Sequence, residues 1–168
     1  MKWKKFIYSN KEYDISHLHP FQLQLGGYKF NVLFSMHCFT RKPLNNEVYD
    51  ETLSYQGPNE KDRVFCFDRY DLSQQLPNII RSLEKRPCWH THHGSFFTIE
   101  LQSSEGERQE YEVYFEVFKS KNGWMTIQIK SAYIRDNYHQ TTQPRKRKIR
   151  FGVIAKNRAS GKKLRPPR

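Results

Sequence analysis

The segment YEVYFEVFKSKNGWMTIQIKSAYI, residues 111–134, decides the fold. Apolar and polar side chains alternate in both of its halves, which is the period of two that a half-buried β-strand requires. The Asn122-Gly123 pair between the halves favours the positive φ angles of a tight turn. The segment therefore predicts an antiparallel hairpin with one apolar and one polar face. The apolar face would hold Phe115, Val117, Ile127 and Ile129, and the polar face Glu112, Tyr114, Glu116, Thr126, Gln128 and Lys130.

One helix and several more strands accompany this hairpin. Five aliphatic residues in 71–85 form one helical stripe, and Pro77 in the polar arc fits a new first turn better than a kink. Residues 41–63 are polar and rich in turn formers, which indicates a loop. Strands are expected at 95–101 and 148–155, the latter with Ile149, Phe151 and Val153 on one face, and hairpins at 4–16 and 21–36, the second turning at Gly26-Gly27.

Together these elements predict an α+β fold, a twisted antiparallel sheet with one main helix on one face and an N-terminal β-hairpin layer that extends or flanks it. We expect a single domain over residues 1–155 and a basic C-terminal tail over residues 156–168. The apolar runs fall well short of the roughly 18 residues of a membrane span. Three cysteines without CxxC spacing indicate reduced thiols. A cytoplasmic location without membrane contact follows as the expectation.

The positive charge is concentrated at the C-terminus. Residues 144–168 contain eleven Lys or Arg and no acid, whereas the first 143 residues carry 18 basic and 17 acidic residues. A neutral body with a basic end is typical of a protein that binds a polyanion, and RNA is the first candidate. A solubilising tail is the alternative. The RNA-binding candidates are Lys130, Arg145, Lys146, Arg147, Lys148, Arg150, Lys162 and Lys163.

The stretch RPCWHTHHG, residues 86–94, holds a cysteine and three histidines. A zinc site was weighed, but one extended strand cannot easily wrap several donors around a tetrahedral ion, so we expect neither a metal nor a cofactor. Acid–base cleavage of RNA through 2′-OH attack needs only His, Tyr, Lys and Arg. Histidines that merely pack or form hydrogen bonds are the alternative. The catalytic candidates are His90, His92, His93, Tyr133 and Arg135; His37, with Thr40 and Arg41, and the pair His17 and His19 are weaker ones.

The second half of the chain resembles a known family of enzymes. A helix, an antiparallel meander ending in MTIQIKSAYIRD (residues 125–136) and a basic strand resemble the RelE- and barnase-type bacterial toxin ribonucleases over roughly residues 71–155. The resemblance implies that Lys130, Ser131, Tyr133 and Arg135 line an RNA groove. Residues 1–65 have no counterpart in that family, and its opening helical hairpin is missing. The whole chain also resembles uncharacterised bacterial proteins described as stationary-phase growth adaptation proteins.

These observations predict a cytoplasmic bacterial ribonuclease that cleaves RNA without a metal. It would be the toxin of a toxin–antitoxin or phage-defence pair, with RNA as substrate and a protein or RNA antitoxin as a possible partner. Two alternatives stay open. One is a non-catalytic RNA-binding or ribonucleoprotein subunit that uses the same sheet face and tail. The other is an adaptor that binds a protein through the loop at residues 41–63.

Overall fold

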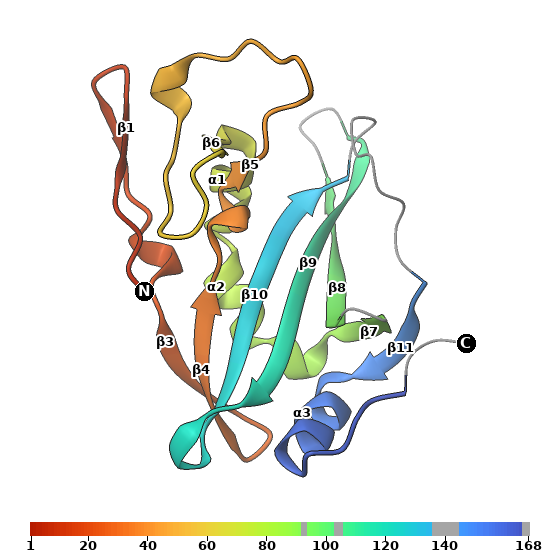
Figure 1. Ribbon diagram of the computed structural model, residues 1–168. Helices are drawn as coiled ribbons and strands as arrows, with labels where there is room; N and C mark the ends of the chain where they lie inside the picture. Colours follow the sequence, from red (N-terminus) through yellow and green to blue (C-terminus); the bar gives the residue numbers. More distant parts are fainter. Residues whose placement is uncertain (92–93, 103–105, 136–144, 166–168) are drawn as a thin grey trace.

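A computed structural model describes residues 1–91, 94–102, 106–135 and 145–165. Its centre is a seven-stranded sheet in the order β11-β7-β8-β9-β10-β4-β3 (Figure 1). Every neighbouring pair is antiparallel except β10 and β4, which run parallel. The strands are β3 (Phe21–Leu25), β4 (Tyr28–Phe34), β7 (Pro87–Thr91), β8 (Gly94–Gln102), β9 (Arg108–Lys119), β10 (Met125–Ile134) and β11 (Arg147–Arg150).

The predicted α+β class is confirmed, and the N-terminal hairpin β3–β4 extends the sheet rather than forming a separate layer. Its two-residue turn has positive φ at both Gly26 and Gly27, as the sequence predicts. Asn122 and Gly123 between β9 and β10 also have positive φ. All four residues tolerate the left-handed region. The connection between β9 and β10 is nevertheless longer than the predicted two-residue turn, because it spans residues 120–124, with the Ser120 N–H donating to the Trp124 carbonyl oxygen at 2.9 Å.

Two small sheets lie outside the main one. Strands β1 (Phe6–Tyr8) and β2 (Lys11–Tyr13) form the first predicted hairpin, and β5 (Thr40–Arg41) pairs with β6 (Val64–Phe65). The intervening loop at residues 42–63 contains only the short 3-10 helix η3 (Glu51–Leu53). Four more 3-10 helices complete the described part: η1 (Ser16–Leu18), η2 (Met36–Cys38), η4 (Leu83–Lys85) and η5 (Lys121–Gly123).

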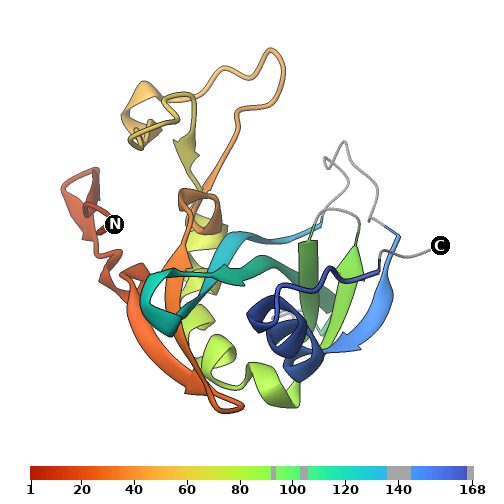
Figure 2. The same ribbon diagram turned by 60° about the horizontal axis from the view of Figure 1, so that its bottom comes forward.

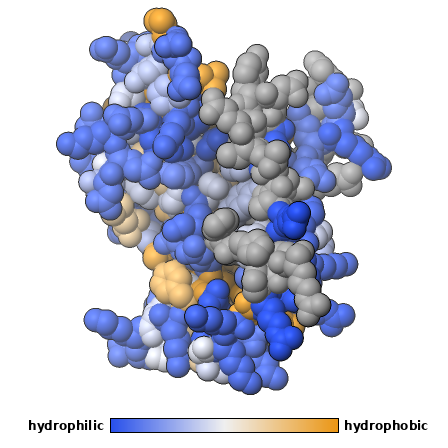
Figure 3. All heavy atoms as spheres, turned by 45° about the vertical axis from the view of Figure 1, so that its right-hand side comes forward, coloured by the Kyte–Doolittle hydropathy of each residue, from blue (hydrophilic) through white to orange (hydrophobic). Residues whose placement is uncertain are grey.

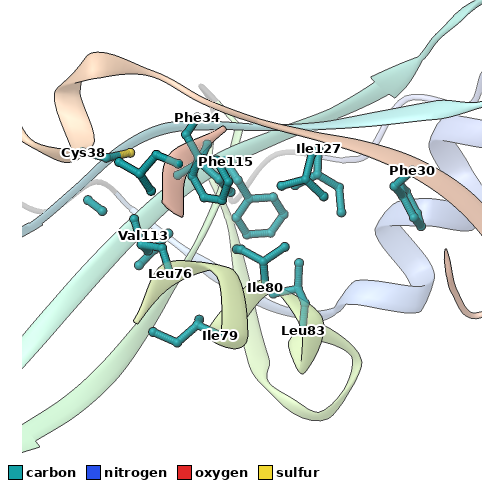
Figure 4. Close-up of a cluster of buried hydrophobic side chains, with 14 of the residues drawn as sticks. Phe30, Phe34, Cys38, Leu76, Ile79, Ile80, Leu83, Val113, Phe115 and Ile127 are labelled. Carbon is teal, nitrogen blue, oxygen red and sulfur yellow. The ribbon is translucent and has the colours of Figure 1, made fainter. Parts of the chain in front are cut away.

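One face of the curved sheet, here called the inner face, is covered by helices (Figure 2). Phe115, Val117, Ile127 and Ile129 are buried there, as the alternation predicts. Figure 4 shows Leu76, Ile79, Ile80 and Leu83 packing beneath the sheet against this apolar layer. The opposite, outer face carries the polar side chains of β9 and β10.

The single helix predicted at residues 71–85 is divided in the structure. Helix α1 (Phe67–Ser73) begins four residues earlier, and α2 (Leu76–Arg81) follows after a two-residue break. Pro77 lies in the first turn of α2, where its missing N–H costs no helical hydrogen bond. Pro77 therefore starts a new helix, as its position in the sequence indicated.

The prediction of a strand at residues 148–155 is wrong in its second half. Strand β11 ends at Arg150, and α3 (Phe151–Ala159) begins at the next residue. Phe151, Ile154 and Ala155 are buried, whereas Val153 is 46% exposed. This is the spacing of a helical face, and so short an apolar run is compatible with either period. The first four residues of the predicted tail belong to α3, and Leu164 packs against the core.

No described helix combines the length and apolar character needed to cross a membrane.

Candidate functional site

A β-bulge in β10 determines which side chains reach the outer face. Ile129 pairs with Phe115, but the next paired residue is Ser131, opposite Tyr114, so Lys130 is an extra residue. One extra residue reverses the alternation beyond it. Tyr133 pairs with Glu112 and thereby lies on the outer face, where strict alternation from Ile129 would have turned it inward.

Four side chains of β9 and the end of β10 form what we call the Tyr133 cluster: Glu112, Tyr114, Tyr133 and Arg135. Arg135 donates to both carboxylate oxygens of Glu112 through Nε at 3.3 Å and Nη2 at 3.1 Å. Tyr114 donates its hydroxyl to the same carboxylate at 2.8 Å. The rings of Tyr114 and Tyr133 stack with centroids 5.7 Å apart. The cluster thus presents one guanidinium and two stacked rings in a fixed arrangement.

The buried Glu112 carboxylate holds the Arg135 guanidinium in a fixed position. Glu112 is only 2% exposed, and Arg135 is 22% exposed. Burial and the hydrogen bond to Glu112 raise the pKa of Tyr114. Burial alone would lower the pKa of Arg135, but its hydrogen bonds to Glu112 and Tyr114 raise it. Arg135 therefore keeps its charge, and Glu112 positions that charge rather than acting as an accessible base.

A second guanidinium reaches the same ring from helix α1. Arg69 Cζ lies 5.0 Å from the Tyr133 ring centroid, and Arg135 Cζ lies 5.8 Å from it. Arg69 Nη1 donates to the carbonyl oxygens of His37 and Thr40 at 3.0 and 2.8 Å. Burial lowers the pKa of Arg69, yet a guanidinium remains protonated at neutral pH. In the described part of the chain, no carboxylate lies within ion-pair distance of this cation.

An imidazole–carboxylate pair adjoins Arg69. His37 Nε2 lies 2.7 Å from Glu60 Oε1, and Arg63 Nη1 lies 3.4 Å from Glu60 Oε2. Burial and the nearby arginines lower the pKa of His37, although Glu60 opposes them. The imidazole is therefore mostly neutral at pH 7. A neutral imidazole oriented by a carboxylate has the chemistry of a general base.

The basic C-terminal segment is folded onto the edge of the sheet. Strand β11 pairs with β7, and Phe151 of α3 packs 5.6 Å from Phe30 on the inner face. Lys146 lies 4.9 Å over the Trp89 ring. Viewed from this side, most of the surface that is not grey is hydrophilic (Figure 3). The exposed cations here are Arg145, Lys146, Arg147, Lys148, Arg150, Lys156, Lys162, Lys163 and Arg165.

Of the three predicted catalytic residues that the structure describes, it brings together two, Tyr133 and Arg135. His90 pairs with Ser95, which pairs with Phe115, so His90 lies on the inner face and is 5% exposed. Its strand β7 is separated from β10 by two strands. His90 therefore does not lie beside Tyr133 and cannot act with it in one site. His92 and His93 lie outside the described residues.

The zinc hypothesis involved Cys88 and His90, which do share one face of β7, and His92. Among residues that the structure describes, no group of three or more His, Cys, Asp or Glu is placed to hold a metal ion.

Sequence reasoning missed several members of the site. Glu112 and Tyr114 were predicted on the polar face but not as members of the site. The signal that could have identified Glu112 is its position opposite Tyr133 in the hairpin. Arg69 gave no local signal, because only the folded chain brings α1 to the end of β10.

The comparisons with known proteins agree with each other. The chain matches the YjaZ family over residues 5–159. It is 31% identical over 143 residues to Protein YjaZ of Escherichia coli (strain K12), an alignment that covers 83% of this chain and 75% of that protein. No solved structure matches the chain, and neither match supports the resemblance to RelE- and barnase-type ribonucleases. The chain belongs to the YjaZ family.

Proposed function

We propose that this protein binds single-stranded RNA across the outer face of its sheet and its basic C-terminal segment. The observation that carries the proposal is the convergence of two guanidiniums, Arg69 and Arg135, on the Tyr133 ring. Guanidiniums recognise phosphate oxygens through paired donors, and tyrosine rings stack on unpaired bases. Arg69 and the Tyr133 cluster supply the two guanidiniums, and a base would extend the existing Tyr114–Tyr133 stack.

The charge distribution supports the same proposal. Among the described residues, Arg69 contacts two backbone carbonyls and an aromatic ring but no carboxylate, so an anion would complete its coordination. The cations of β11 and α3 form an acid-free region of the chain that would add phosphate contacts and steer association. A single strand is favoured over a duplex because a base must be unpaired and unstacked before it can stack on a tyrosine ring.

Fluorescence anisotropy with a labelled 12-nucleotide RNA tests the proposal. Arg69→Met should weaken binding about tenfold and reduce the slope of log K against log salt by about 0.7, the loss of one phosphate contact on a single strand. Arg81→Met is the matched control, because Arg81 also stacks on an aromatic ring, at 4.3 Å from Phe21, but lies outside the cluster. Unchanged affinity and slope in a folded Arg69→Met variant would refute the proposal.

A second candidate is metal-independent RNA cleavage, favoured by the His37–Glu60 pair beside Arg69. In this reaction neutral His37 takes the 2′-OH proton and the 2′-oxygen attacks the adjacent phosphorus. The P–O5′ bond then breaks, and the departing 5′-oxygen takes a proton from solvent water, giving a 2′,3′-cyclic phosphate and a 5′-hydroxyl. Arg69 and Arg135 would stabilise the phosphorane. A toxin role in an antitoxin or phage-defence pair would be a consequence of this activity.

RNA incubated with the protein in EDTA separates the two candidates. Fragments ending in cyclic phosphate, lost in His37→Gln and retained in His17→Gln, would establish cleavage at this site. Intact RNA under conditions where binding saturates would leave binding as the function. Growth arrest on expression, abolished by His37→Gln, would extend the enzymatic result to a toxin.

A further inference from the structure

A pocket of about 320 Å³ lies beside the His37–Glu60 pair. This volume is at the lower end of the roughly 300–1,000 Å³ typical of small-molecule sites. Trp3, Leu33, Met36 and Pro58 form its apolar wall, and Glu60 and Gln128 supply polar atoms. An apolar cavity with few polar groups at its edge is the usual composition of a site for a planar ring.

The wall of this pocket is rigid where a ring would stack. The Trp3 indole donates from Nε1 to the Phe34 carbonyl oxygen at 3.1 Å and stands edge-on to Phe39 at 5.6 Å. On the loop side, Gly57 donates its N–H to the Glu60 carbonyl oxygen at 2.9 Å, which fixes the turn that carries Pro58. An indole and a proline ring held in this way offer preformed surfaces for a base.

Glu60 and Gln128 give the pocket its hydrogen-bonding character. Each Glu60 oxygen has one described partner, His37 or Arg63, and a carboxylate accepts up to about four hydrogen bonds. Within the described part of the chain, Gln128 Nε2 has one long bond of 3.3 Å, to the Ile129 carbonyl oxygen, so its amide can rotate toward a ligand. The pocket thus combines an apolar wall with the Glu60 carboxylate, which accepts hydrogen bonds, and the Gln128 amide, which can rotate to donate or accept one.

We infer that this pocket binds one nucleobase of the RNA, and that guanine is the base it prefers. Guanine presents two adjacent donors, N1–H and the N2 amino group, to the two oxygens of a carboxylate. Adenine and cytosine offer one amino group each, and uracil offers one imide N–H. This inference rests on the proposed function, because the pocket adjoins the Tyr133 cluster through Glu60, His37 and Arg69.

Isothermal titration calorimetry with guanosine 5′-monophosphate, uridine 5′-monophosphate and ribose 5-phosphate tests the inference. The guanine nucleotide should bind about tenfold more tightly than the other two, which is within the range of one additional hydrogen bond to a charged group. Leu33→Trp fills the pocket and should remove this preference. Asn31→Trp is the matched control, because it introduces the same indole on the same strand and face outside the pocket.

The outcomes separate this inference from the proposed function. Equal binding of all three compounds, or a guanine preference that survives in folded Leu33→Trp, would overturn the pocket assignment even if the 12-nucleotide RNA still binds. Guanine binding without any RNA binding would instead overturn the proposed function. Glu60→Gln provides an independent measurement, since loss of one acceptor oxygen should reduce the guanine preference; an unchanged preference in the folded variant would contradict the role of this carboxylate.

Discussion

Phe151→Ala should release the basic segment from the body of the protein. The Phe151 side chain is 1% exposed, and its ring lies 5.6 Å from Phe30 and 6.4 Å from Phe115. A buried phenylalanine removes about 150–250 Å² from water, and truncation to alanine costs about 3–5 kcal/mol. With a urea m-value of about 2 kcal/mol/M, a loss of about 4 kcal/mol lowers the unfolding midpoint by about 2 M.

Val153→Ala is the internal control for this experiment. Val153 lies two residues further along α3 and is 46% exposed, so its truncation should change the free energy of unfolding by no more than about 0.5 kcal/mol. Equal destabilisation by both substitutions would refute the helix, because only a strand places the two side chains on one buried face. A midpoint shift below about 0.5 M for Phe151→Ala would refute the packing of α3.

Three further predictions concern charge and burial. Glu112→Gln should lower the free energy of unfolding by about 1.5–3 kcal/mol, because it removes the charge from the buried carboxylate to which Arg135 and Tyr114 donate, whereas Glu116→Gln at the exposed neighbouring site should cost at most about 1 kcal/mol; urea melts measure both. The hydrogen bonds from Arg41 lower the pKa of the Glu47 carboxyl from 4.5 to about 2. The stabilisation of the folded protein by this ion pair is therefore present above pH 4.5 and is lost as the pH falls towards 2. The difference in Tm between the natural protein and Glu47→Gln should vanish across that pH range. Burial raises the pKa of Cys38 and Cys88 to about 12. Both thiols should therefore resist iodoacetamide at pH 8 in the folded protein and react after unfolding, which mass spectrometry would detect. Labelling of either cysteine in the folded protein would contradict its burial.

The parts of the fold that depend on local chemistry were predictable from the sequence. The hairpin turns at Gly26-Gly27 and Asn122-Gly123 follow from the φ angles that these residues tolerate. The inner face of β9 and β10 follows from alternation. The helix boundary at Pro77 follows from its missing N–H.

The rest depends on contacts between distant parts of the chain. The parallel pairing of β4 with β10 joins residues about a hundred positions apart in sequence, and no local pattern specifies such a partner. The bulge at Lys130 is likewise set by the pairing with β9. The run from Phe151 to Ala155 fits a strand or a helix equally well, and its packing against Phe30 decides for the helix.

The candidate site was likewise predictable where its residues are close in sequence and not where they come from distant elements. Tyr133 and Arg135 share a strand and were predicted together, and the structure confirms that they lie together. Arg69 joins them from a separate helix. His90 was placed with them because histidine suits acid–base chemistry, but the strand order separates it from Tyr133.

The salt dependence of RNA binding tests the central claim most directly. Anisotropy titrations of a 12-nucleotide uridine RNA at 50–300 mM salt should give a slope of log K against log salt of about −3 or steeper, because at least four or five phosphates would each contribute about 0.7. Replacing Lys146, Lys148 and Arg150 together with glutamine should reduce this slope by about 2. A slope near zero, or no binding at 50 mM salt, would contradict the account.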